Sequence, residues 1–221
     1  MININNTAIK GLYHGNQPIS SVYVGNTNVW SANAGQTVYF NQLINYDNIV
    51  VSSLGTSMGY SIVKDVDNHA ITWTTLASAS SYDSLIIKNA PTLVSVIAGH
   101  IYLSIWTTEY TSGSTQTRPT NTKTGTYGGS GLNVLEEYYG LPTDNKSICY
   151  SRYSLDIIKS YSQASYMCHF PTQRSQIKIS NMMLFDLTLM FGEGKEPTAQ
   201  QFFDMFPDDY YNYNPGEYIT I

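Results

Sequence analysis

Short runs of alternating hydrophobic and polar residues recur along most of the chain, separated by polar turns. They fall at residues 48–52, 60–64, 70–75, 85–88, 93–97, 101–107, 147–153, 166–170 and 177–189. Side chains alternate between the two faces of a β-strand, and strands at regular short spacing are typical of a β-sandwich or barrel. The pattern therefore predicts an all-β fold, with a bend at Asn181 in the last run.

One segment near the C-terminus has a helical pattern instead. Pro197 stands at an early helical position, good helix formers follow it, and Pro207 ends the run. Phe202, Phe203 and Phe206 lie on one side of such a helix, so we expect this aromatic side to dock on the sandwich. A tyrosine-rich turn and a short last strand follow.

The first thirty residues contain two similar units, each with a short strand, a tyrosine and a Gly-Asn pair. The tyrosines are Tyr13 and Tyr23, and the second unit leads to Trp30. Gly and Asn tolerate positive φ, so both units suit tight hairpin turns. Because hairpins of this size have no core of their own, we divide the chain into a hairpin module (1–34) and a main domain (35–221).

Composition and charge exclude several function classes. Hydrophobic residues make up 42% of the 221 residues, enough for a substantial core, but charged residues make up only 12% and tyrosine occurs 19 times. The net charge of −5 and the scattered Lys and Arg disfavour nucleic acid as a partner. No apolar run is long enough for a transmembrane helix, and the first residues lack the pattern of a signal peptide. We expect synthesis in a cytoplasm and no insertion into a membrane.

Cysteine, histidine and acidic residues show no pattern typical of a cofactor site. Cys149 and Cys168 lie in strand-like runs, where they are either two packed thiols or a disulfide between neighbouring strands. The four histidines lack zinc-ligand spacing, and no Asp-x-Asp-x-Asp run supports calcium. We expect no cofactor, with a structural calcium ion left open.

The sequence also offers no convincing catalytic centre. Glycoside hydrolysis needs two carboxyl groups facing each other in a cleft. Asp65 and Asp67 precede a turn-like Asn-His pair, and Glu136 and Glu137 fall in a segment that we interpret as a solvated turn of helix. The hydrolase elbow and the phosphate-binding loop are both missing from the sequence. We therefore expect a protein that is not an enzyme.

The C-terminal third of the chain carries LFDLT (184–188), a Gly-rich turn, the helix, Phe206-Pro207, and a Tyr-Tyr-x-Tyr-x-x-Gly tail that ends at Gly216. This combination resembles a recurrent ending of bacteriophage structural proteins. Residues 40–43 and 98–103 match earlier parts of the same pattern, so the resemblance spans roughly residues 36–216. The N-terminal hairpins resemble, more weakly, the leading module of phage tail and virion proteins. Residues 44–48 and the Thr/Ser/Gly-rich stretch 111–131 depart from the pattern.

The resemblance implies a jelly-roll β-sandwich of the carbohydrate-binding-module type, preceded by the hairpin module and carrying one short C-terminal helix. It implies a non-enzymatic virion protein (a tail fibre, head fibre or capsid decoration) made in the cytoplasm of a bacterial host. The hairpins would anchor it to other virion proteins, and the domain would serve assembly or host attachment. An alternative is an adhesin module that recognises bacterial surface glycan. A glycan depolymerase is the weakest of the three alternatives.

Sugar sites of jelly rolls stack aromatic faces on the sugar ring, which selects candidates from the aromatic residues. The candidates are Trp73, Tyr82, Trp106, Tyr110, Tyr127, Tyr138 and Tyr139. The alternation around Trp73 and Trp106 favours core positions for both. Tyr110 and Tyr127 flank the 111–131 loop, which favours exposure.

A second group of aromatic residues is predicted to lie at subunit contacts, because tyrosine concentrates at interfaces. Its members are Tyr13, Tyr23, Trp30, Tyr210, Tyr211 and Tyr213. For the last three, the favoured interpretation is that they cover the end of the sandwich beside the phenylalanine helix, and a subunit contact is the alternative. A hairpin module that cannot bury itself favours a symmetric homo-oligomer, with a trimer as one expectation.

Overall fold

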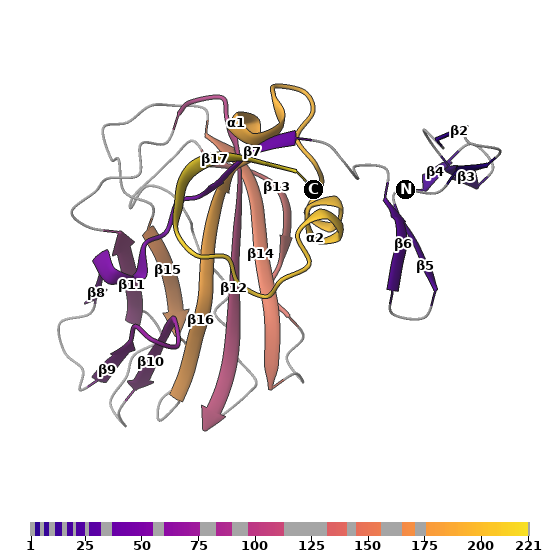
Figure 1. The fold of residues 1–221 in the computed structure, drawn as a ribbon. Helices are drawn as coiled ribbons and strands as arrows, with labels where there is room; N and C mark the ends of the chain where they lie inside the picture. The colour runs from indigo at the N-terminus through magenta and orange to yellow at the C-terminus, as the bar shows by residue number, and fades with distance from the viewer. Residues whose placement is uncertain are drawn as a thin grey trace.

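The computed structural model describes residues 37–54, 60–75, 83–89, 97–112, 132–140, 145–155, 165–170 and 176–220, together with six short strands before residue 32. Antiparallel strands predominate among them, so the fold is all-β (Figure 1). The short N-terminal strands are β1 (Asn3–Ile4), β2 (Thr7–Ala8), β3 (Leu12–His14), β4 (Gln17–Ile19), β5 (Ser21–Val24) and β6 (Thr27–Ser31). They pair as β1-β2, β3-β4 and β5-β6, each pair forming a two-stranded sheet of its own.

The main sheet has eight strands. They are β7 (Thr37–Gln42), β9 (Tyr60–Asp65), β10 (Ala70–Thr75), β12 (Ile101–Ser112), β13 (Leu132–Tyr138), β14 (Lys146–Leu155), β16 (Gln176–Asp186) and β17 (Asn214–Thr220). The order is β13-β14-β12-β16-β10-β9, and β7 pairs with both β16 and β17. A second sheet has the order β15-β11-β8, formed by β15 (Ser165–Phe170), β11 (Asp83–Asn89) and β8 (Ile49–Leu54).

The central strand β16 changes its partner along its length. Ile179 pairs with β12 on one edge and β10 on the other, whereas Phe185 pairs with β12 and β7. The change falls at a β-bulge, where Asn181 and Met182 stand opposite Trp106. Asn181 has a φ of 53°, a left-handed conformation that Asn tolerates better than most residues. The bend expected at Asn181 is therefore confirmed.

The bulge keeps one face of β16 in register with the same core. Ile177 and Ile179 before it, and Met182 and Leu184 after it, belong to one buried cluster. After the bulge, Met183 and Phe185 point to a second buried cluster on the opposite face, whereas Lys178 and Ser180 before it are only half-buried. A strand without the extra residue would exchange the two faces at this point, because side chains alternate with a period of two. The second half of β16 is therefore buried on both faces, and the first half on one.

Two amides at the end of β7 connect the strand to its neighbours. The buried Gln42 side chain accepts hydrogen bonds from the Ile44 and Leu184 backbone N–H groups and donates to the carbonyls of Ile44 and Tyr211. The Asn41 side-chain oxygen accepts from the Asp186 N–H at 3.0 Å. A buried polar group without a partner costs about 1–3 kcal/mol. Both ends of the Gln42 amide are satisfied where β7, β16 and the C-terminal segment meet, whereas the Asn41 Nδ2 atom has no hydrogen-bond partner among the described residues.

The glycine that ends the tyrosine-rich tail has a steric reason to be glycine. Gly216 has a φ of 117° and lies at a bulge between β17 and β7. A Cβ atom at this position would overlap the ring of Tyr39. Any other residue would therefore have to shift the tyrosine as well as adopt an unfavourable backbone conformation.

The predicted helix is confirmed as α2 (Ala199–Met205), and the structure corrects two neighbouring assignments. The last run ends at Asp186, and residues Leu187–Phe191 form the helix α1 instead of continuing the strand. Glu136 and Glu137 lie in the strand β13, not in a turn of helix. A short 3-10 helix, η1 (Tyr46–Asn48), follows β7. Within the described residues, no helix is long and apolar enough to cross a membrane.

Other predictions fall partly or wholly outside the described residues. The run at 93–97 and most of the 111–131 loop are among them, although Thr111 and Ser112 continue β12. The side chains of residues 1–36 are not described, so the division between a module at 1–34 and a domain at 35–221 stays a prediction.

The bulge can be tested by substitution of Asn181. We expect N181A to lower the free energy of unfolding by about 1–2 kcal/mol, the cost of a left-handed backbone for an ordinary L-residue. N181G should stay close to the parent chain, because glycine adopts this conformation without strain. Urea denaturation measures both values, and an N181A chain as stable as the parent would contradict the bulge as a conformational constraint.

Candidate functional site

The position of α2 is set by its first turn and its phenylalanines. Thr198 caps the helix, with reciprocal hydrogen bonds between Thr198 and Gln201. Phe202 is buried against Phe185, with ring centroids 4.7 Å apart, and Phe206 is buried beside it. Phe203 is only half-buried. The helix thus covers part of the sheet and leaves one aromatic ring at its border.

A cavity of about 330 Å³ lies between α2, the sheet and the segment after the helix. The residues that line it are Ile105, Tyr138, Ile148, Tyr150, Met183, Phe202, Phe203, Phe206, Pro207, Asp208, Asp209 and Tyr211. Most of this lining is apolar or aromatic. Its volume is at the lower end of the range of small-ligand sites, about 300–1,000 Å³. We refer to it as the α2 cavity.

Three rings form a row along the α2 cavity. Tyr138 and Tyr150 face each other across the β13-β14 pair, with ring centroids 6.1 Å apart. The ring of Tyr150 then meets Phe203 edge-on, at 5.6 Å and an interplanar angle of 67°. The row therefore runs from β13 at the sheet edge, across β14, to α2.

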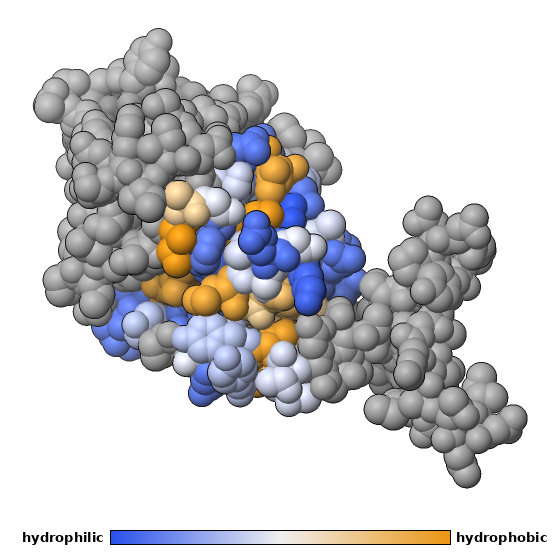
Figure 2. Space-filling model, turned by 90° about the horizontal axis from the view of Figure 1, so that it is seen from above, coloured by the Kyte–Doolittle hydropathy of each residue, from blue (hydrophilic) through white to orange (hydrophobic). Residues whose placement is uncertain are grey.

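The border of the α2 cavity is exposed. Tyr138 is 39% and Ile148 is 47% exposed, with Val134 and Leu135 exposed nearby on β13. Seen from above in Figure 2, the described surface carries several hydrophobic patches separated by hydrophilic residues. Exposed apolar groups that border a cavity mark a surface suited to a ligand or partner.

Two exposed carboxylates complete the α2 cavity. Asp208 and Asp209 directly follow Pro207, and the Asp208 N–H donates to the Tyr211 hydroxyl at 3.1 Å. Burial raises the pKa of Tyr211, and the Asp208 carboxylate adds to this effect. Among the described residues, neither carboxylate forms an ion pair with Lys, Arg or His.

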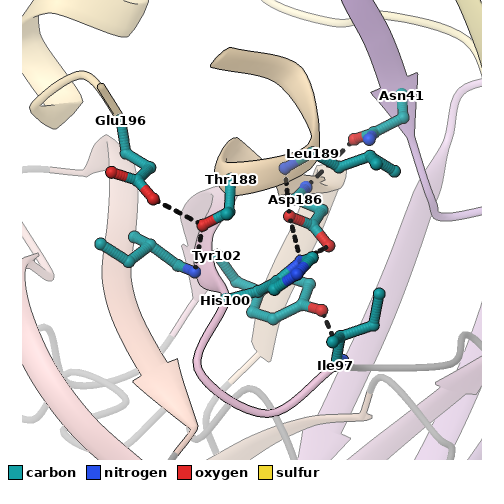
Figure 3. A network of polar contacts seen from close by, with 9 residues as sticks. Asn41, Ile97, His100, Tyr102, Asp186, Thr188, Leu189 and Glu196 are labelled. Carbon is teal, nitrogen blue, oxygen red and sulfur yellow. Dashed lines mark hydrogen bonds and ion pairs between the residues drawn. The ribbon is translucent and has the colours of Figure 1, made fainter. Parts of the chain in front are cut away.

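A second polar cluster lies at the start of α1 (Figure 3). The Asp186 carboxylate accepts from the Leu189 N–H and lies 2.8 Å from the His100 Nδ1 atom. Thr188 Oγ1 accepts from the Ile101 N–H and donates to Glu196. These contacts cap α1 and attach it to β12, so the cluster is explained by structure.

Tyr102 lies below this histidine and receives the Ile97 N–H on its hydroxyl at 2.7 Å. Burial raises the pKa of Tyr102, and Asp186 raises it further. The phenol is therefore neutral at physiological pH and serves as a hydrogen-bonding group in the core.

The structure places two of the sugar-stacking candidates in the core. Trp73 and Trp106 are each 1% exposed and belong to the cluster with Ile177 and Leu184. Buried rings leave no face for a sugar, so neither forms a stacking platform here. Tyr82 and Tyr127 lie outside the described residues, as does the side chain of Tyr110.

Tyr138 and Tyr139, the other two candidates, differ in surroundings. Tyr138 contributes to the α2 cavity, whereas Tyr139 packs against Trp106 on the opposite side. Burial raises the pKa of Tyr139, and its hydroxyl donates to Glu137 at 2.7 Å. Of the candidates whose side chains the structure describes, only Tyr138 presents an exposed ring at a cavity.

The C-terminal tyrosines mainly cover the fold. Tyr210 stacks on His69 at 4.0 Å, and burial raises the pKa of Tyr210 to about 12. Tyr211 packs against Phe40 and Phe206. Tyr213 is 43% exposed and stays a candidate for a subunit contact. The side chains of Tyr13, Tyr23 and Trp30 are not described.

The acidic pairs have local roles where they are described. The Asp65 carboxylate accepts from both the backbone and side-chain N–H groups of Asn68, which lowers the pKa of Asp65 in a turn. Glu136 accepts from the Ala199 N–H at the start of α2 and pairs with Arg152. Within the described part of the chain, no group of three or more His, Cys, Asp or Glu could hold a metal ion.

The cysteine alternatives are settled in part. Cys149 is a thiol buried in the core, with its sulfur 3.8 Å from Thr108 Oγ1. The side chain of Cys168 lies outside the described residues. In comparisons with known proteins, no family model matches this chain, and no curated protein matches its sequence.

Sequence reasoning did not find the α2 cavity as a whole. It named Tyr138 and placed the phenylalanines on a helix, but it assigned no role to Tyr150, Asp208 or Asp209. One signal was available: β14 carries apolar or aromatic residues on both faces at Ile148, Cys149 and Tyr150, which indicates that a second layer covers it.

Phe202 and Phe203 should differ in their contribution to stability. We expect F202A to lower the free energy of unfolding by about 3–5 kcal/mol, because it opens a hole in the core. F203A should cost clearly less, since its ring lies at the border of the α2 cavity. Urea denaturation of both variants compares them within one helix, and equal losses would show that Phe203 is a core residue unavailable to a ligand.

Proposed function

We propose that this chain is a non-enzymatic structural protein of a bacteriophage particle. Residues 1–34 would attach it to other virion proteins, and residues 35–221 would form a jelly-roll domain that serves assembly or host attachment. The proposal is based on the resemblance between residues 36–216 and phage structural proteins.

One observation carries the proposal: the parts of the resembling pattern pack together as one unit. Phe40, Phe185, Phe202, Phe206 and Tyr211 contact one another on one face of the sheet. They come from the FNQL, LFDLT, helix, Phe-Pro and Tyr-Tyr parts of the pattern, which lie far apart in the sequence. A pattern whose parts depend on one another in space is better evidence of common architecture than scattered matches are.

The sheets are compatible with the jelly-roll part of the proposal. The main antiparallel sheet has a buried cluster on each face of its central strands, and a second antiparallel sheet has three strands, an arrangement consistent with the two layers of a sandwich. Symmetric assembly into a homo-oligomer remains part of the proposal, since virion positions repeat.

A second candidate function is recognition of bacterial surface glycan. The ring of Tyr138 favours it, because an exposed aromatic face at the border of a cavity can stack on a sugar ring. The half-buried rings of Tyr150 and Phe203 continue the row from Tyr138. The two functions are compatible, since a projecting virion domain can also bind the host.

Antibody-gold labelling of intact particles from the parent genome tests the virion role. We expect label at a regular position on the particle, because a structural protein repeats with the particle symmetry. Label at the tail tip would point to host attachment, and label over the capsid would point to a head fibre or decoration. Particles without any label would overturn the proposal.

Deletion of residues 1–34 tests whether this segment attaches the chain to the particle while residues 35–221 fold independently. We expect the remaining chain to keep its β-sheet circular dichroism and cooperative unfolding, because both buried clusters lie within residues 38–206. The same deletion should abolish incorporation into particles. A truncated chain that fails to fold, or that still assembles, would contradict an anchoring module.

A further inference from the structure

The α2 cavity combines two kinds of surface that suit one class of ligand. Its walls are aliphatic or aromatic, whereas Asp208 and Asp209 are the only charged residues in its lining among the residues that the structure describes. Within this part of the chain no Lys, Arg or His contributes to the lining, and the sequence carries a net charge of −5. An anionic ligand would therefore meet like charge and no cationic partner.

The scarcity of polar groups also disfavours a ligand with many hydroxyls. Besides the two carboxylates, the side chains of the lining offer only the hydroxyls of Tyr138, Tyr150 and Tyr211 for hydrogen bonding. The Tyr211 hydroxyl already receives the Asp208 N–H. Buried hydroxyl groups that lack partners reduce affinity. The interior of the cavity therefore favours an apolar ligand group, and a sugar ring would be restricted to the exposed ring of Tyr138 at the border.

A positively charged ligand with an apolar surface fits both features. Aromatic faces attract cations through their ring quadrupole, and carboxylates add direct attraction. A primary ammonium ion is strongly hydrated and must replace lost water with hydrogen bonds. A quaternary ammonium ion donates no hydrogen bonds and is the cation that aromatic sites recognise best.

We propose that the α2 cavity binds the quaternary ammonium group of a small choline-type molecule. The methyl groups contact Tyr138, Tyr150 and Phe203, and Asp208 and Asp209 supply the compensating negative charge. A cavity of about 330 Å³ accommodates a head group of this size. The inference concerns the cavity alone, so it succeeds or fails independently of the virion role and differs from glycan stacking on the same rings.

Titration of the full chain with three probes tests the ligand class. The probes are choline, its uncharged carbon analogue 3,3-dimethyl-1-butanol, and the primary amine ethanolamine. We expect choline to bind about tenfold more tightly than either of the others, the ratio that corresponds to a cation–aromatic contact. Two-dimensional NMR measures each affinity and locates the shifted resonances.

Four outcomes of this titration would overturn the proposal. The first is no binding of choline, and the second is choline binding with shifts confined to residues away from the α2 cavity. The third is equal affinity for choline and its uncharged analogue, which would show apolar recognition without a role for charge. The fourth is stronger binding of glucose or glucosamine than of choline, which would assign the rings to glycan recognition.

A charge-neutralising variant and a matched control separate recognition from general electrostatics. The double variant D208N/D209N keeps the shape of the cavity, and we expect it to weaken choline binding about tenfold without changing the affinity for 3,3-dimethyl-1-butanol. E193Q removes an exposed carboxylate outside the cavity lining and should leave choline binding unchanged. Equal losses in the two variants would overturn a local role for Asp208 and Asp209. Circular dichroism checks that both variants remain folded.

Discussion

The structure depends on one constraint: β16 keeps one face in a single core along its whole length and has to pair with two different strands along one edge. Asn181 satisfies it by adopting a left-handed conformation that inserts one extra residue opposite Trp106. Before the inserted residue β16 pairs with β10 along this edge, and after it β16 pairs with β7. Ile179 and Met182, on either side of the insertion, nevertheless pack in the same core. Without it, apolar residues of the second half would exchange faces with their neighbours.

The second face of the sheet follows from this arrangement. Once β7 pairs beside the end of β16, Asn41 and Gln42 can reach the backbone of Asp186, Leu184 and Tyr211. Asp186 in turn caps α1, and the chain then returns through α2 across the face that holds Phe185. The C-terminal segment is therefore a covering layer of the sheet instead of an appended tail.

The α2 cavity exists because this covering layer is incomplete. A helix of seven residues covers the centre of the face but not its edge at β13 and β14. Rings at that edge remain in part exposed, and the turn after Pro207 brings two carboxylates to the same place. A rigid sheet and a capped helix hold the border, which favours a ligand site with little rearrangement on binding.

Local pattern was sufficient for much of the fold. The runs at 60–64, 70–75 and 147–153 are strands, residues 199–205 are helical, and Asn181 bends the last strand. These features depend on side-chain alternation, on capping by Thr198, and on the left-handed preference of Asn, all of which act over a few residues. Burial of Trp73 and Trp106 likewise follows from the alternation around them.

Tertiary structure decided the features that depend on distant partners. Glu136 lies in a strand because β13 pairs with β14 and its carboxylate meets the start of α2, sixty-three residues away. The Tyr138, Tyr150 and Phe203 row likewise requires two strands and a helix to meet. Sequence by itself determined which residues can form strands, turns and a helix, because those preferences are local. Which aromatic rings stay exposed was decided only by how completely the C-terminal layer covers the sheet.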